Sequence, residues 1–127
     1  MTSDGHAISR LQRLIASDRG TVNQIRALVA ELPAKPDLEL ALAILLALLD
    51  REPDTWPRAA ARWGSRFALE RNLTLPDAQL TLAALAVLPG AGGRGGAEAL
   101  IDLADRHGLR RVDQVLGDWT DRQGLGT

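Results

Sequence analysis

The segment Pro53–Asn72 carries the side chains in this sequence that are best suited to contact an anion. Arg58, Arg62 and Arg66 recur at every fourth position, so on a helix they lie on one face. A guanidinium presents a planar fork of N–H donors that matches a phosphate or a carboxylate. Trp56 adds an aromatic ring on which a nucleobase stacks. These four residues are therefore candidates for binding a protein or nucleic-acid partner.

The same segment also has a structural interpretation. Trp56, Ala60, Trp63 and Phe67 recur at helical spacing on a second face, as the core-facing side of an amphipathic helix does. The arginines would then form the solvated side of that helix. The sequence leaves both interpretations open, and it favours the core for Trp63.

Gly90, Gly92 and Gly95 match the G-x-G-x-x-G pattern that cradles a dinucleotide phosphate. That site requires a strand before the glycines and another after the following helix. The preceding stretch is rich in alanine and leucine and begins with a helix cap at Thr74, and no Gly-Lys-Ser/Thr follows the glycines. We therefore predict a glycine-rich connector between two helices at residues 90–96, and no cofactor.

Catalytic and metal-binding patterns are missing from the local sequence. The chain has no cysteine, which excludes disulfides and thiolate nucleophiles. Its two histidines stand near opposite ends, and no Ser/His/Asp set or metal-ligand spacing is present. We expect no catalytic, cofactor-binding or metal-binding residue, and thus a protein that is not an enzyme.

Hydrophobic spacing is helical almost throughout the 127 residues. It predicts an all-α fold, a compact bundle of about six or seven amphipathic helices that form a single domain over residues 1–127. The segment from about Asp37 to Arg51 is apolar nearly all round, which places it at the centre of the bundle. Short breaks at Gly20, 33–36, Pro53 and Gly108 separate the helices.

Net charge and hydropathy restrict the cellular location and the partners that we expect for this protein. The formal net charge is −1, which argues against a surface built entirely for nucleic acid. The longest apolar run, Leu40–Leu49, has about half the length that a bilayer span needs. The N-terminal residues lack the pattern of a secretory signal. We expect a cytoplasmic protein that does not bind a membrane.

The C-terminal part, AEALIDLADRHGLRRVDQVLGDWTDRQG, resembles the end of the DnaD-type domain of bacterial primosome proteins. Val112, Val115, Leu116 and Trp119 occupy that family's apolar and tryptophan positions, and the resemblance covers at most residues 72–124. It implies single-stranded DNA binding and helicase loading, with Arg110, Arg111 and Trp119 as contact residues. Arg111 stands where the family has tyrosine, and acids outnumber arginines from residue 91 onward.

Two functions follow from these observations as expectations. The first is an all-helical protein-interaction module, an adaptor or a self-associating protein, because no chemistry is assembled and the composition is rich in alanine and leucine. The alternative is a DnaD-like nucleic-acid-binding module acting in DNA replication or repair. A third interpretation places a small-molecule pocket between helices.

Overall fold

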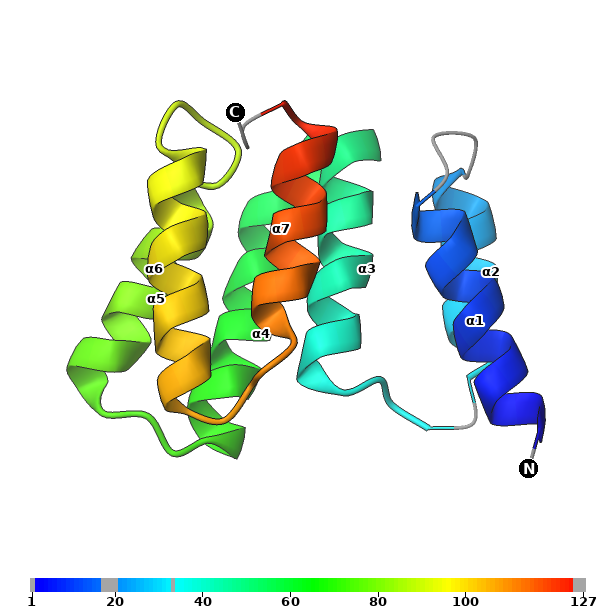
Figure 1. Cartoon of the computed structure of the whole chain (residues 1–127), viewed down its shortest axis with the longest axis horizontal. Helices are drawn as coiled ribbons and strands as arrows, with labels where there is room; N and C mark the ends of the chain where they lie inside the picture. Colours follow the sequence, from blue (N-terminus) through cyan, green and yellow to red (C-terminus); the bar gives the residue numbers. More distant parts are fainter. Residues whose placement is uncertain (1, 17–20, 33, 125–127) are drawn as a thin grey trace.

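The fold, given by a computed structural model, is described for residues 2–16, 21–32 and 34–124, and it is all-α (Figure 1). Seven α-helices occupy this part of the chain, without strands, which confirms the all-α bundle predicted from hydrophobic spacing. A short 3-10 turn, η1 (Pro53–Thr55), precedes the fourth helix. The helices are α1 (Thr2–Ala16), α2 (Val22–Ala30), α3 (Leu38–Arg51), α4 (Trp56–Glu70), α5 (Leu75–Val87), α6 (Gly93–Arg106) and α7 (Val112–Arg122).

Local sequence signals set several helix ends. Thr21 begins α2 with a capping box, in which its hydroxyl accepts from the Gln24 backbone N–H and the Gln24 side chain accepts from the Thr21 N–H. Asp37 and Thr74 cap α3 and α5 with their side-chain oxygens, which accept from the backbone N–H groups of Leu40 and Asp77. Gly108 follows α6 with a φ of 83°, a left-handed conformation that glycine adopts without strain.

Helix α3 lies at the centre of the molecule, as its apolar circumference predicts (Figure 1). One side contacts α4 and α7, and the other contacts α1 and α2. Among the described helices, α1 and α2 contact only each other and α3. The molecule therefore consists of a main bundle, α3 to α7, with an α1–α2 hairpin on the outer side of α3.

The core is divided between these two parts. The main cluster draws buried side chains from α3, α4, α5, α6 and α7, including all three tryptophans and Phe67. A second cluster joins the hairpin to the other face of α3, and it contains Leu11, Ile15, Ile25, Leu28, Ile44 and Ala47. Because α3 contributes to both clusters, it needs apolar side chains around its whole circumference.

The glycine-rich connector is shorter than the predicted 90–96, because α6 begins at Gly93. Gly93 and Gly96 are buried in the first turns of that helix. A Cβ at Gly96 would lie 2.6 Å from the Ala84 carbonyl oxygen of α5, so this glycine permits close contact between α5 and α6. The sequence prediction missed this packing role because it treated the whole glycine run as a linker.

Candidate functional site

The three predicted arginines of α4 lie on one face of that helix, opposite its buried side. Arg58 and Arg62 are exposed, and neither forms an ion pair within the described part of the chain. Arg66 is half-buried and pairs with Glu70 one turn later. The face therefore presents two available guanidinium groups, where the sequence suggested three.

The tryptophans of the candidate set are core residues. Trp56 is 3% exposed, and its indole Nε1–H donates to the Leu85 carbonyl oxygen at 2.9 Å. Trp119 is 2% exposed and donates to Asp50 Oδ1 at 3.1 Å. Trp63 is also buried and donates to the Leu38 carbonyl oxygen. Buried rings with satisfied N–H groups have no face to stack on a base, so the structure favours the core interpretation for Trp56 and Trp119.

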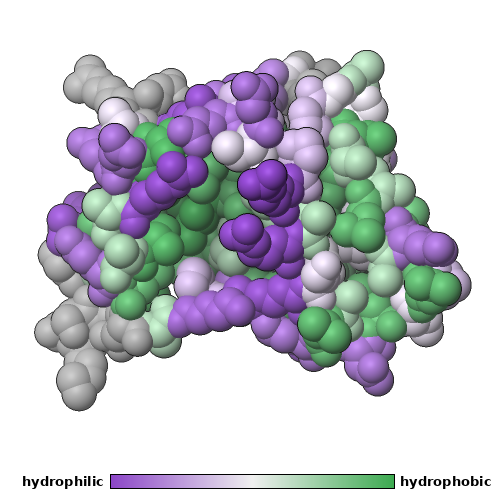
Figure 2. Space-filling model, turned by 180° about the vertical axis from the view of Figure 1, so that it is seen from behind, coloured by the Kyte–Doolittle hydropathy of each residue, from purple (hydrophilic) through white to green (hydrophobic). Residues whose placement is uncertain are grey.

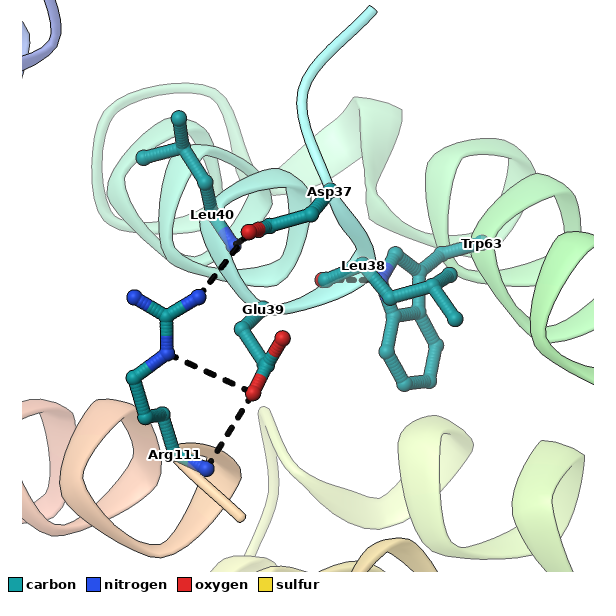
Figure 3. A network of polar contacts seen from close by, with 6 residues as sticks. All are labelled: Asp37, Leu38, Glu39, Leu40, Trp63 and Arg111. Carbon is teal, nitrogen blue, oxygen red and sulfur yellow. Dashed lines mark hydrogen bonds and ion pairs between the residues drawn. The ribbon is translucent and has the colours of Figure 1, made fainter. Parts of the chain in front are cut away.

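Arg111 is held by the beginning of α3 (Figure 3). Its Nη2 lies 2.9 Å from Asp37 Oδ2 and its Nε lies 3.5 Å from Glu39 Oε2, while its backbone N–H also donates to Glu39. The hydrogen bond to Glu39 and the charges of both carboxylates raise the pKa of Arg111 above its ordinary value. The guanidinium is exposed, but Nε and Nη2 already contact carboxylates, and the negative charge of Asp37 and Glu39 beside it opposes the approach of a phosphate.

Arg110 lies apart from the arginines of α4. It lines a shallow groove along α6 and the start of α7 together with Glu98, Asp102, Asp105 and Asp113. Figure 1 places α6 and α7 in front of α4. The predicted candidates thus fall on separate surfaces, and Arg110 stands among acids that repel a phosphate.

His107 has a partner that its sequence position did not suggest. Its Nε2 lies 3.1 Å from Asp77 Oδ2 of α5, and its ring meets Phe67 edge-on at a centroid distance of 6.1 Å. Both side chains of the pair are less than one quarter exposed. The contact links the end of α6 to the start of α5. The Asp77 carboxylate therefore points towards His107 and away from the exposed side of α5.

An uncharged surface on α5 is the feature that residue-type patterns missed. The large apolar side chains with the greatest exposure are Leu69 at the end of α4 and Leu75, Leu80, Leu82 and Val87 of α5. We call the exposed side of α5 the α5 face. It comprises eight residues without a charge: Leu75, Pro76, Gln79, Leu80, Leu82, Ala83, Ala86 and Val87.

The α5 face continues onto the neighbouring edge of α4. A Cβ at Gly64 would lie 2.7 Å from Leu82 Cδ2, so this side of α4 adjoins α5. Pro57 lies seven residues before Gly64, Ala61 three before it and Ala68 four after it. Helical spacing therefore places all three on the same side of α4 as Gly64. Hydrophobic residues accordingly gather on the right in Figure 2, where α5 lies.

The sequence held a signal for this surface. The run LTLAALAV, residues 80–87, is apolar apart from Thr81, so apolar side chains lie nearly all round this part of α5, as they do around α3. Such a helix is normally enclosed on all sides. Among the described helices, α3 is enclosed by four others, whereas α5 contacts only α4 and α6.

A groove of about 330 Å³ separates α1 from α3 and α7. Apolar residues such as Leu40 and Ala43 line it together with the charged residues Glu39, Arg111, Asp118 and Arg122.

Two other kinds of site are missing from the described residues. No cluster of three or more potential metal ligands is present among them. None of the described helices has both the length and the apolar character needed to cross a bilayer.

Comparison of the chain with protein-family models, curated proteins and solved structures finds no match.

Proposed function

We propose that this chain is a non-enzymatic protein-interaction module and that its contact surface is the α5 face. The observation that carries the proposal is the absence of charge from the eight exposed residues of α5. Each of the other six described helices exposes at least one charged side chain. The α5 face is thus distinguished by composition as well as by exposure.

The physical argument rests on the contiguity of this surface. Single exposed apolar side chains are normal on soluble domains, but contiguous apolar patches mark contact sites. The centres of protein interfaces are depleted of charged residues. Burial of apolar surface yields about 25 cal/mol per Å², so covering several leucines favours association appreciably.

Site-specific photo-crosslinking in cells tests the proposal. A photoreactive phenylalanine derivative at Gln79, in the middle of the α5 face, is expected to form a protein adduct. The matched control carries the same group at Gln114, an exposed glutamine of α7. Equal labelling at both positions, or no adduct at Gln79, would contradict the proposal.

Nucleic-acid binding through α4 is the second candidate function. Its support is the pair of exposed arginines, Arg58 and Arg62, which have no ion-pair partner in the described residues. The DnaD-type resemblance assigns Arg110, Arg111 and Trp119 to the same function. The acidic surroundings of Arg110, the ion pairs of Arg111 and the burial of Trp119 make the protein-interaction proposal the stronger one.

A further inference from the structure

We infer that the occupant of the α5 face is a second copy of this chain, packed α5 against α5 about a two-fold axis near Gln79. This inference rests on the proposed function, and it names the partner. Three properties of the face support a second copy as the occupant: its lack of charge, the chemistry of its single polar side chain, and the small side chains at its centre.

A two-fold interface places each patch against an identical patch, so any charge near the axis meets its own copy. A face suited to such pairing should therefore lack charge near the axis, and most faces of this molecule carry exposed arginines or carboxylates. The α5 face carries neither, and Asp77, the one charged residue of α5, points to His107. The net charge of −1 adds little repulsion between two whole chains.

Gln79 is the only exposed side chain of the α5 face that can donate a hydrogen bond. It has no hydrogen-bond partner in the described part of the chain. An amide carries both donors and an acceptor, so two glutamines related by a two-fold axis satisfy one another. Buried amide pairs of this kind set the register of helix pairs.

Two of the three residues at the centre of the α5 face have small side chains. Helical periodicity places Gln79, Ala83 and Ala86 along its middle, with Leu75 and Leu82 on one flank and Leu80 and Val87 on the other. The two alanines let the helix backbones approach closely beside the Gln79 pair while the flanking leucines interdigitate. Helix α5 spans thirteen residues, so the contact is about 20 Å long and belongs among small interfaces.

A small interface predicts reversible association with a dissociation constant on the order of micromolar or weaker. Sedimentation equilibrium of the purified chain, from low micromolar to near-millimolar concentration, should show the mean mass rising from one chain towards two. A chain that stays monomeric throughout this range overturns the inference.

A matched pair of substitutions locates the contact. Gln79→Arg should weaken self-association by about tenfold or more, because two like charges then face each other in a dehydrated contact. Gln114→Arg makes the same chemical change on α7 and should associate like the original chain. Both positions are exposed and arginine suits a helix, so both variants should fold, as circular dichroism will verify. Equal association of the two variants overturns the inference.

Cysteine crosslinking supplies a second measurement on the folded chain. Because the sequence contains no cysteine, Gln79→Cys introduces a single thiol. Oxidation should link two chains at this position, since a disulfide forms only where Cα atoms approach within about 7 Å. Gln114→Cys is the control and should link far more slowly.

The two proposals fail in different ways. If Gln79 crosslinks to a different protein in cells while the purified chain remains monomeric, self-pairing is wrong and the protein-interaction function stands. If Gln79 forms no adduct in cells and the purified chain is monomeric, both are wrong.

Discussion

The three indole N–H groups show how single residues connect distant parts of this chain. Leu85 lies four residues before Pro89, which has no N–H to continue the helical ladder. Its carbonyl oxygen receives only a 3.3 Å bond from Leu88 N, and Trp56 Nε1–H completes it at 2.9 Å. Asp50, which accepts from Trp119, also accepts from Gln123 at 2.8 Å and is exposed.

The acceptor of Trp56 is a carbonyl with one other, long hydrogen bond, whereas the acceptor of Trp119 is an exposed carboxylate with a second donor. Replacing each tryptophan by phenylalanine should therefore have unequal effects on stability. Trp56→Phe should lower the free energy of unfolding by about 2–4 kcal/mol, because it leaves a buried carbonyl poorly satisfied and removes packing. Trp119→Phe should cost less, since Asp50 keeps its bond from Gln123 and its access to water. Urea unfolding followed by circular dichroism measures both. A larger loss for Trp119→Phe would contradict this account.

The arginines of α4 give a residue-scale test of the alternative function. Two available guanidiniums neutralise about two phosphates, so binding to single-stranded DNA should show a log–log salt slope of only about −1.4. Replacing Arg58 and Arg62 by glutamate should abolish that binding. Fluorescence anisotropy measures it, with a double replacement of Arg94 and Arg106 on α6 as the control. A much steeper slope would show that further cations take part.

At the scale of elements, helix contacts decide where glycine is required. Gly95 and Gly96 are adjacent in α6, yet a Cβ at Gly95 meets nothing within 4 Å while one at Gly96 meets the backbone of α5. The glycine run therefore combines a helix start with a packing contact.

Alanine substitutions at these two positions should have opposite signs. Gly95→Ala should raise the free energy of unfolding by about 0.5–1 kcal/mol through helix propensity. Gly96→Ala should lower it by about 1–3 kcal/mol, because the Ala84 carbonyl and Val87 must move. Thermal and urea unfolding of both variants measures the pair. Stabilisation by Gly96→Ala would show that the α5–α6 contact is looser than described.

At the scale of the whole molecule, the two core clusters imply two levels of stability. The α1–α2 hairpin is attached to the rest by one small cluster on α3 and by the exposed ion pair Arg26–Glu52. Exposed ion pairs contribute at most about 1 kcal/mol. The buried residues of the larger cluster all lie outside the hairpin, so we expect this cluster to persist if the hairpin opens.

Native-state hydrogen exchange should resolve these levels. Amides of α2 are expected to exchange through a partial opening whose free energy is lower than that of global unfolding, while those of α4 and α6 exchange only on global unfolding. A shared free energy for α2 and α4 would show instead that the whole chain unfolds as one unit.

Much of the architecture follows from local sequence because its causes are local. Hydrophobic periodicity, the cap residues Thr21, Asp37 and Thr74, and the glycine at 108 act within a few residues of themselves. They predict about six or seven helices, where the described residues form seven, and the apolar circumference of α3 predicts its central place. The α4 arginine face is predictable for the same reason, since i,i+4 spacing places side chains together on any helix.

The candidate site depended on contacts between segments far apart in sequence. Whether Trp56 and Trp119 are core, and whether Arg111 is available, depends on Leu85, Asp50 and Glu39, which no local pattern connects to them. By sequence, α3 is apolar nearly all round and α5 is described only as rich in alanine and leucine, and tertiary packing alone left one side of α5 open. An apolar surface is buried or exposed according to the number of neighbours a helix acquires, and that number belongs to the assembled bundle.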